Sequence, residues 1–303
     1  MVLQPKLEVL DLAEWGQSNR NCIDQCLHQY GAILFRNFSI PAIDTFQKFL
    51  TDVAGKLIEY QYRSTPRSPV NGLLYSSTEY PADQSIPLHN EESYSRRWPM
   101  RLGFHCVRPP DAQGETPLAD SRRVYAKLPD GLRQRFAEKQ ILYVRNYGTG
   151  LDLSWEEVFQ TTQKSKVEAY CHQEGISFEW QGEHALRTWQ ICPAVATHPH
   201  TREPLWFNQA HLFHITNLPK HIREDLLDCM AEEDLPRQAY YGDGTPIEWE
   251  ALDEIRSIYQ EETVLFLWQK GDVLLVDNML VAHGRSSFSG TRQIVVGMAS
   301  PHG

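Results

Sequence analysis

His89 and Glu91 are separated by one small polar residue in the stretch SIPLHNEESY, residues 85–94. Residues two apart on a strand point to the same face, so the imidazole and the carboxylate would lie side by side. Two histidines and one carboxylate on one octahedral face form a non-haem iron(II) site, and three positions stay open for other ligands. Alone, the pair also fits two polar residues that merely share a strand face, so a third ligand is needed.

His283 is the best candidate for the third ligand. It ends the apolar run VLLVDNMLVAH, residues 273–283, and a glycine follows it. A histidine at the end of a buried strand can reach into the mouth of a barrel. The alternative is a core histidine bonded to a backbone carbonyl.

Arg292 lies nine residues after His283, beyond the turn SSFSG, where we expect it on the next strand with its guanidinium facing the barrel interior. Buried arginine is rare unless it is paired, and its fork fits a carboxylate through two hydrogen bonds. A dicarboxylate such as 2-oxoglutarate could chelate the metal at one end and place its far carboxylate on Arg292 and the Thr116 hydroxyl. The alternative for Arg292 is a surface salt bridge. For Arg285 that alternative is preferred, although Arg285 remains a rival for the co-substrate.

Candidate substrate contacts are polar or aromatic residues near the ends of expected elements: Tyr94, Arg145, Asn146, Phe207 and Asn208. Arg145 and Asn146 precede a glycine-rich loop and could hold a substrate carboxylate, because loops commonly carry specificity. An amide in WFNQ, residues 206–209, could hold an amino-acid head group. The alternatives are a loop salt bridge, a structural amide and, for Tyr94, core packing.

Composition excludes several classes of function. The 303-residue chain has a formal charge of 29 − 39 = −10, whereas nucleic acids and anionic membranes bind clustered basic residues. Neither is therefore expected as a partner. The start, MVLQPKLEVLDLAEW, lacks the regions of a signal peptide, and no apolar run reaches the length of a membrane span. The six cysteines are scattered, as reduced thiols in a cytoplasmic protein would be.

The elements that must position these residues follow from periodicity. Helices are expected over 19–31, over 42–57, after Ser121 as N-cap, and over 154–174, where Ser154 and Glu157 have capping-box spacing. Strands are expected over 32–38 and 99–110, and three more within 262–300. Without repeats or linkers, this order predicts a single domain over residues 1–303. The fold would be mainly β with helical insertions, around a double-stranded β-helix (a cupin-like jelly roll).

Five longer stretches together carry a family resemblance: PLHNE, GETPLADSRRVY, EPLWFNQAH, YGDGTPI and WQKGDVLLVDNMLVAHGRSSFSGTRQIVVGM. Over roughly residues 30–300 the chain resembles the taurine dioxygenase-like (TauD/TfdA) superfamily of Fe(II)/2-oxoglutarate-dependent oxygenases. Its SyrP-like and clavaminate synthase-like branch is the most similar. The resemblance implies His89, Glu91 and His283 as iron ligands, Thr116 and Arg292 as 2-oxoglutarate contacts, and a helical insertion around 121–175.

Glu91 departs from the aspartate that is commoner in the superfamily, although clavaminate synthase-like and asparagine oxygenase-like members also have glutamate. Any carboxylate here argues against the halogenases that resemble this family, because they replace it with a small residue. The resemblance therefore implies that Fe(II), 2-oxoglutarate and dioxygen oxidise an unactivated C–H bond.

The resemblance implies an amino-acid-like substrate, free or tethered to a carrier protein, and β-hydroxylation in the biosynthesis of natural products such as antibiotics. Desaturation, cyclisation and oxidative decarboxylation are alternative outcomes of the same chemistry. A zinc-dependent hydrolase with the same three ligands and a non-catalytic jelly-roll binding module are alternatives of other classes. The sequence leaves a homo-oligomer open.

Overall fold

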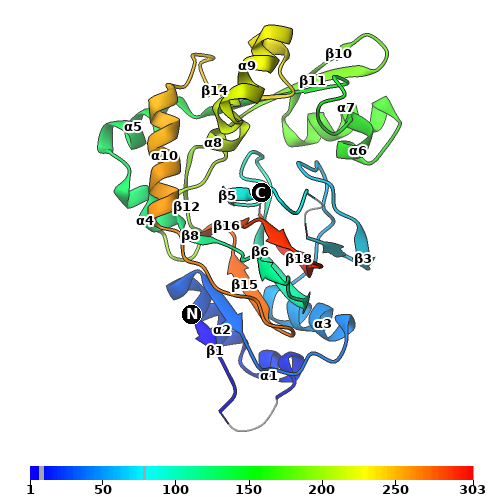
Figure 1. Ribbon diagram of the computed structural model, residues 1–303, viewed down its shortest axis with the longest axis vertical. Helices are drawn as coiled ribbons and strands as arrows, with labels where there is room; N and C mark the ends of the chain where they lie inside the picture. Colours follow the sequence, from blue (N-terminus) through cyan, green and yellow to red (C-terminus); the bar gives the residue numbers. More distant parts are fainter. Residues whose placement is uncertain (7–9, 78–79, 303) are drawn as a thin grey trace.

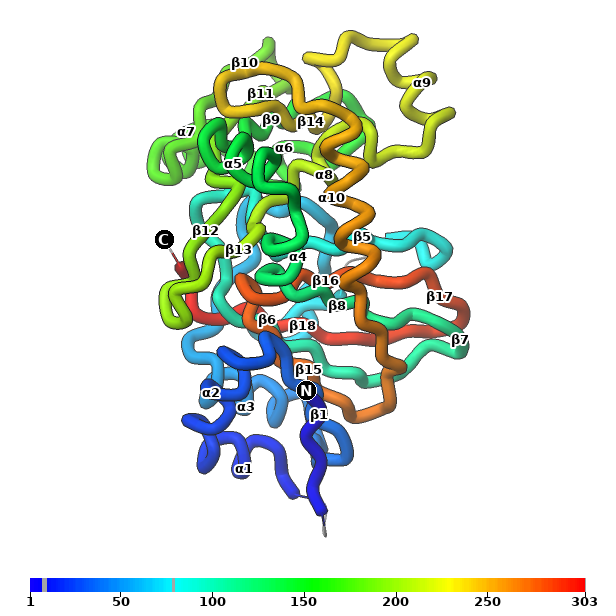
Figure 2. The backbone as a smooth tube through the Cα atoms, turned by 90° about the vertical axis from the view of Figure 1, so that its left-hand side faces the viewer, coloured from blue at the N-terminus to red at the C-terminus, as the bar shows by residue number. Residues whose placement is uncertain are grey.

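The computed structural model describes residues 1–6, 10–77 and 80–302. Its centre consists of two β-sheets, which lie between three N-terminal helices at one end and a long insertion at the other (Figures 1 and 2). The larger sheet contains, in spatial order, β1 (Val2–Leu3), β2 (Ala32–Phe35), β15 (Val273–Asp277), β6 (Trp98–Arg108), β18 (Gln293–His302), β4 (Leu74–Ser76) and β3 (Pro69–Asn71). The smaller sheet contains β5 (Ile86–His89), β16 (Val281–Arg285) and β8 (Leu118–Asp120). This arrangement confirms a jelly-roll core.

The central strand β6 is buried on both of its faces. Phe104 packs toward the smaller sheet, where its ring lies 5.2 Å from that of His283. The next residue, His105, points the other way and packs against Phe46. A strand is buried on both faces when layers cover both sides of its sheet. Because Phe46 lies in the helix Ile43–Ala54, the layer that covers this face of the larger sheet is helical.

Three helices cover the outer face of the larger sheet: α1 (Leu12–Ser18), α2 (Arg20–Tyr30) and α3 (Ile43–Ala54). The helix predicted over 19–31 ends as expected, because Gly31 adopts the left-handed conformation with φ 71°. Leu50 of α3 is fully buried above Gly103 and Gly297, and a Cβ atom on Gly103 would lie 2.2 Å from its Cδ2. The two glycines therefore let α3 approach the sheet closely.

The apolar run 273–283 forms two strands and not the single strand that we expected. β15 belongs to the larger sheet and β16 to the smaller one, and the chain crosses between them at residues 278–280. The carboxylate of Asp277 accepts hydrogen bonds from the backbone N–H groups of Met279 and Leu280, at 3.1 and 3.2 Å. Such side-chain bonds to the following backbone favour a turn over a continued strand. The first of the three strands predicted within 262–300 was also wrong. Residues 262–268 form only an isolated bridge, between Val264 and Leu118.

The insertion runs from β8 to β15 and is longer and less helical than the predicted 121–175. Its helices are α4 (Ser121–Lys127), α5 (Asp130–Lys139), α6 (Trp155–Phe159), α7 (Lys164–Glu174), α8 (Ala210–Phe213), α9 (Lys220–Cys229) and α10 (Trp249–Glu261). Its strands are β9 (Ile141–Tyr147), β10 (Ser177–Gln181), β11 (Ala185–Cys192), β12 (Val195–Thr197), β13 (Pro204–Trp206) and β14 (Arg237–Tyr241). Four of these strands form a sheet in the order β10-β11-β9-β14.

Local capping explains two differences from the predicted helices. The capping box of Ser154 and Glu157 is present, but the helix stops at Phe159 because Gln160 turns left-handed with φ 53°. The predicted helix over 154–174 is therefore two helices, α6 and α7. Helix α4 is capped by the carboxylate of Asp120, which accepts from the N–H of Arg122, so the predicted N-cap at Ser121 was wrong.

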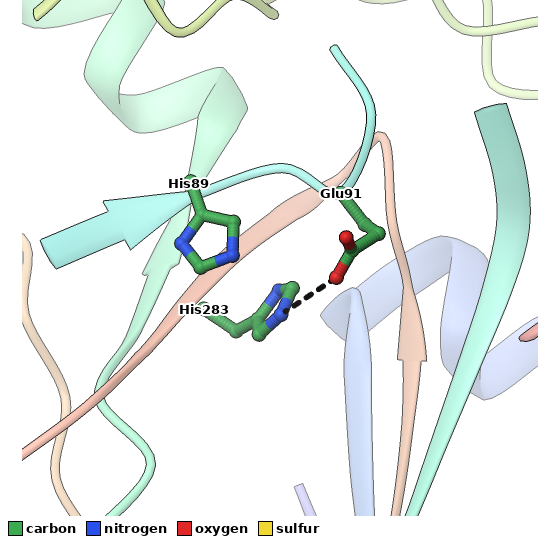
Figure 3. Close-up of side chains that lie close together, drawn as sticks. All are labelled: His89, Glu91 and His283. Atoms are coloured by element: carbon green, nitrogen blue, oxygen red, sulfur yellow. Dashed lines mark ion pairs between the residues drawn. The ribbon is translucent and has the colours of Figure 1, made fainter. Parts of the chain in front are cut away.

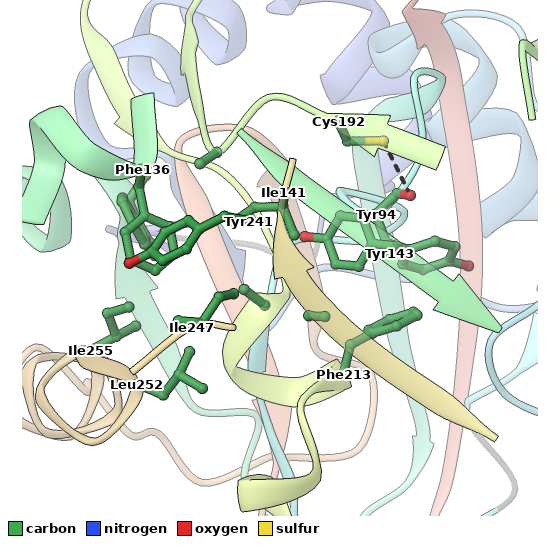
Figure 4. Packing of buried hydrophobic residues seen from close by; sticks show 14 of the residues in the cluster. Tyr94, Phe136, Ile141, Tyr143, Cys192, Phe213, Tyr241, Ile247, Leu252 and Ile255 are labelled. Carbon is green, nitrogen blue, oxygen red and sulfur yellow. Dashed lines mark hydrogen bonds between the residues drawn. The ribbon is translucent and has the colours of Figure 1, made fainter. Parts of the chain in front are cut away.

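A large hydrophobic cluster joins the insertion to the smaller sheet. Leu88, Ala119 and Ala282 come from that sheet and lie in the same cluster as aromatic residues of the insertion. Figure 4 shows part of this cluster, in which the rings of Tyr143 and Phe213 lie 4.9 Å apart. The insertion is thus packed against the jelly roll, while a single domain over 1–303 stays a prediction. No helix within the described residues has the length and apolarity to cross a membrane.

Replacing Leu50 by Ala should lower the free energy of unfolding by about 2–5 kcal/mol, because the surrounding backbone cannot close the resulting cavity. Denaturant-induced unfolding measures this change, provided that the slope of the free energy against denaturant concentration is the same for variant and wild type. Leu151→Ala is the matched control, since Leu151 is 55% exposed and its loss should change the value by less than about 0.5 kcal/mol. Equal midpoints for the two variants would contradict the packing of α3.

Candidate active site

His89, Glu91 and His283 lie together between the two sheets (Figure 3). His89 ends β5 and pairs directly with His283 of β16 across the smaller sheet. Their ring centroids are 4.5 Å apart, and Nε2 of His283 is 3.8 Å from Oε2 of Glu91. One ligand atom from each of the three residues lies within 4.8 Å of the others. The three residues predicted from the sequence therefore form a group that could hold one metal ion.

The surroundings of both imidazoles favour the neutral ring, in which one nitrogen carries a lone pair that can bind a metal ion. Nδ1 of His89 donates to the backbone carbonyl of Pro87 at 2.8 Å, which leaves the lone pair on Nε2. Burial lowers the pKa of His89, and burial together with the charges of His89 and Arg67 lowers that of His283 well below its ordinary value. A metal ion needs the unprotonated ring, so this environment favours metal binding over protonation.

Glu91 follows β5 in a turn and is not on the strand itself. Its backbone N–H donates to Oδ1 of Asn278 at 2.7 Å, and Nδ2 of Asn278 donates back to its carbonyl at 2.9 Å. Its carboxylate accepts from Nη2 of Arg67 at 2.7 Å, in a pair that is buried on both sides. Asn278 fixes the backbone of Glu91 and Arg67 orients its side chain.

Gly284 allows the strands that carry the two histidines to approach each other. A Cβ atom at this position would lie 2.6 Å from the carbonyl oxygen of Ile86 in β5. That oxygen belongs to the backbone and cannot rotate away, so any side chain at 284 would push the two strands apart.

A narrow cavity of about 30 Å³ adjoins the two histidines. Three arginines line it, Arg67, Arg285 and Arg292, together with Thr116, and no acidic residue is among its lining residues. Burial and the charge of Arg285 lower the pKa of Arg292 to about 10, so the guanidinium is still a cation at neutral pH. Because Arg67 is paired with Glu91, the positive charge of the narrow cavity comes from Arg285 and Arg292.

Arg292 and Thr116 meet in the narrow cavity, as predicted. Arg292 donates to the carbonyl of Gly114 at 3.0 Å and to Oγ of Ser77 at 3.2 Å, and its Nη2 lies 3.5 Å from Oγ1 of Thr116. Thr116 also accepts from the indole N–H of Trp268 at 3.1 Å. These contacts hold both side chains at the wall of the cavity.

Arg285 is buried, with 5% exposure, so its interpretation as a surface salt bridge is wrong. Its guanidinium donates to the backbone carbonyls of Tyr80, Pro81 and Gln84, at 2.9, 2.6 and 2.7 Å. It therefore fixes the segment that leads into β5 while it contributes charge to the narrow cavity.

A second, wide cavity of about 400 Å³ also borders His89 and is lined by Glu91 as well. Gln209, Phe213 and Arg237 of the insertion line it. Its volume is in the range of small-molecule sites. The candidate metal ligands thus face two different spaces, of which the narrow one is positive and the wide one mixed.

None of the five predicted substrate contacts is among the residues that line the wide cavity. Arg145 is buried among tyrosine rings, and Tyr94 packs behind Phe213 with 5.2 Å between ring centroids. The other three are held by the fold: Asn146 donates to the carbonyls of Glu233 and Leu235, Asn208 donates to that of Ala194, and Phe207 packs on Trp98. The structure does not bring these residues to the metal ligands.

Three residues of the site were missed as site residues by sequence reasoning, Arg67, Arg237 and Asn278, whereas Gln209 is one of the amides expected in WFNQ. Asn278 interrupts the apolar run 273–283, which was a usable signal. Gln209 lies beside the predicted Asn208 in WFNQ. Arg67 and Arg237 have no local signal, because only the tertiary fold brings them to the site.

Comparison with known proteins adds three findings on sequence. The sequence model of the family described as "Taurine catabolism dioxygenase TauD, TfdA family" matches residues 3–299. The chain is 42% identical over 279 residues to the dapdiamide synthesis protein DdaC of Enterobacter agglomerans, covering 92% of this chain and 85% of that protein. It is 31% identical over 305 residues to a clavaminate synthase-like protein of Arabidopsis thaliana, covering 97% and 89% of the two chains.

Solved structures with similar folds are more distant in sequence. An asparagine oxygenase in complex with Fe(II), 2S,3S-3-hydroxyasparagine and succinate superposes with a TM-score of 0.60 at 13% identity, over 98% of this chain and 93% of that one. PvcB, an Fe, α-ketoglutarate-dependent oxygenase from an isonitrile synthetic pathway, superposes with a TM-score of 0.55 at 14% identity, over 98% and 84%. At these identities the likeness shows the fold alone.

Replacing Gly284 by Ala should weaken metal binding at least about tenfold, because the added methyl group separates the strands that carry His89 and His283. Titration of the purified protein with Fe(II) or Mn(II) measures the affinity. Gly131→Ala is the control, since a Cβ atom there meets nothing within 4 Å. An unchanged affinity in a folded Gly284→Ala variant would contradict the argument from strand spacing.

Proposed function

Because the chain belongs to the taurine catabolism dioxygenase TauD, TfdA family, we propose that it oxidises an unactivated C–H bond of an amino acid or an amino-acid derivative. The co-substrates are 2-oxoglutarate and dioxygen, and the metal is Fe(II). The proposed outcome is β-hydroxylation in natural-product biosynthesis, with a small molecule, free or carried by another protein, as the partner.

The donor set fits Fe(II). His89 and His283 offer neutral imidazole nitrogens, and Glu91 offers a carboxylate already oriented by Arg67. Two histidines and one carboxylate are the ligands of non-haem Fe(II) oxygenases, which leave open positions for co-substrate and dioxygen. Fe(II) bound there would activate dioxygen, the oxidant, with 2-oxoglutarate as the reductant, while the chain orients the substrate and excludes water.

The positive narrow cavity is the observation that carries the proposal. Its lining includes Arg285 and Arg292, next to the two histidine ligands, and the third arginine, Arg67, is already paired with Glu91. A cationic wall beside the metal ligands suits an anion, and 2-oxoglutarate is a dianion with one end suited to the metal. Arg292 and Thr116 would hold the far carboxylate. A zinc hydrolase with the same three ligands would not need Arg292 and Thr116.

The wide cavity supports a separate small substrate beside the metal. It borders His89 and Glu91 and has room for an amino-acid-sized molecule. The relative at 42% identity is named for the synthesis of dapdiamide, and the asparagine oxygenase structure holds a hydroxylated asparagine. These two proteins favour an amino-acid-derived substrate for this chain as well.

Under anaerobic conditions, Fe(II) and 2-oxoglutarate should give the wild-type protein a weak metal-to-ligand charge-transfer band in visible light. His283→Ala should abolish the band by removing a ligand. Arg292→Ala should weaken the affinity for 2-oxoglutarate about 10- to 100-fold, because charged hydrogen bonds to the far carboxylate are lost. Titration of the band with 2-oxoglutarate measures both effects.

Arg108→Ala is the matched control, since Arg108 is an exposed arginine at the end of the neighbouring strand and should leave the titration unchanged. If the wild type gives no band, the oxygenase proposal is wrong. A hydrolytic activity that needs zinc and survives Arg292→Ala would identify the alternative class.

A further inference from the structure

Arg237 of β14 is the one arginine among the residues that line the wide cavity, and its guanidinium is only partly used by the fold. Nε and Nη2 bind the carboxylate of Asp152, the latter at 2.7 Å, and Nη2 also donates to the carbonyl of Ser64 at 2.6 Å. Nη1 donates to no described residue and is not among the buried unpartnered atoms. It is therefore a cationic donor that has no partner among the described residues and is not fully buried.

The charge around Arg237 is not balanced. Arg145 of β9 lies directly opposite Arg237 in the register of the two strands, so the two side chains share one face of the sheet. Arg145 is buried against the rings of Tyr62 and Tyr147 and forms no ion pair with a carboxylate of the described chain.

Both arginines act on the same acid, because their charges lower the pKa of Asp152 although burial alone would raise it. Two cations thus share one anion. The excess positive charge lies at the side of the wide cavity, where Nη1 of Arg237 is available.

Gln209 supplies a complementary acceptor in the same cavity. Its Nε2 donates to the carbonyl of Asn90 at 2.7 Å, and its backbone N–H donates to the hydroxyl of Tyr143 at 2.7 Å. These bonds fix which end of the amide is oxygen, because a carbonyl can only accept. Oε1 has no partner among the described residues and is not a buried unpartnered atom. It therefore offers a lone pair to a ligand N–H.

We propose that Arg237 binds a carboxylate of the substrate and that Gln209 accepts a hydrogen bond from its ammonium or amide N–H. The wide cavity would then recognise the two polar groups of an amino acid or an N-acyl amino acid. Phe213, whose ring centre lies 5.6 Å from the guanidinium carbon of Arg237, forms an apolar wall beside them. This inference rests on the proposed function and narrows its substrate class to molecules with a free carboxylate.

The alternative is that Arg237 only ties β14 to Asp152 and Ser64. A structural tie would affect stability but would not make the cavity prefer a carboxylate over a carboxamide of the same shape. The preference between acid and amide therefore separates the two roles.

The test is calorimetric titration of the anaerobic Fe(II)- and 2-oxoglutarate-loaded protein with pairs of probes. The probes are the free L-amino acids and their N-acetyl derivatives, each beside its α-carboxamide. We expect the best-binding acid to bind wild type at least about tenfold more tightly than its amide, since a charged hydrogen bond is lost. Aspartate and asparagine α-amides show whether a side-chain carboxylate is the group recognised.

Arg237→Gln should reduce the ratio of the affinities for acid and amide to near one. Arg237→Lys should restore part of the preference, because it returns the charge without the two-pronged hydrogen bonding of a guanidinium. Arg187→Gln is the matched control, since Arg187 lies on β11 in the same sheet and does not line the wide cavity. If Arg237→Gln fails to fold, the double variant Asp152→Asn/Arg237→Gln removes the buried charge that it leaves.

Three results would overturn the inference: no acid of the panel binds wild type, amides bind as well as acids, or Arg237→Gln keeps the preference. Failure of this inference can be distinguished from failure of the proposed function. A charge-transfer band without acid preference would remove the carboxylate site alone. Acid preference without a band, measured on protein loaded with Mn(II), would leave the carboxylate site and remove the oxygenase proposal.

Discussion

The hydrogen bonds of Asp277 and Asn278 are the constraint on which the site depends. Asp277 turns the chain out of the larger sheet by accepting from two backbone N–H groups, and β16 then enters the smaller sheet with His283. Asn278 binds the backbone of Glu91 on both its N–H and its carbonyl. Two neighbouring side chains therefore set the positions of ligands that are 192 residues apart in the chain, from Glu91 to His283.

His89 lies at the boundary between two electrostatic environments. The narrow cavity is lined by Arg285, Arg292 and the Arg67 that pairs with Glu91, and the wide cavity has mixed polar and apolar walls. The proposed function places the far carboxylate of 2-oxoglutarate in the first space and the substrate in the second, with the candidate metal ligand His89 bordering both. The jelly roll and its adjoining segments line the first space, and the insertion contributes part of the wall of the second.

The parts of this arrangement that the sequence predicted are those with a local pattern. His89 and Glu91 could be found because they are two residues apart, and His283 because it ends an apolar run beside a glycine. Arg292 and Thr116 followed from the family resemblance and from the need for a carboxylate partner. The jelly roll followed from alternating strands near both ends of the chain.

The parts that the sequence missed depend on contacts between distant segments. Arg145 was expected to hold a substrate carboxylate, but the sheet buries it among tyrosines and turns its cross-strand neighbour Arg237 to the cavity. Nothing near Arg237 in the sequence distinguishes it from a surface arginine. The segment 262–268 had the composition of a strand but lies where only a single bridge to Leu118 can form. In both cases the segment that packs or pairs with the residues determined their structure, and this cannot be read from local composition.

The buried pair of Arg67 and Glu91 has a consequence for how the protein meets its metal. A lone carboxylate in this position would cost several kcal/mol, so a site without such a pair would need the ion in order to fold. Here the guanidinium already compensates the charge, at 2.7 Å. The negative charge of Glu91 is therefore already balanced when no ion is bound. Removal of the ion would leave this carboxylate oriented and compensated, so that the same site can take up an ion again.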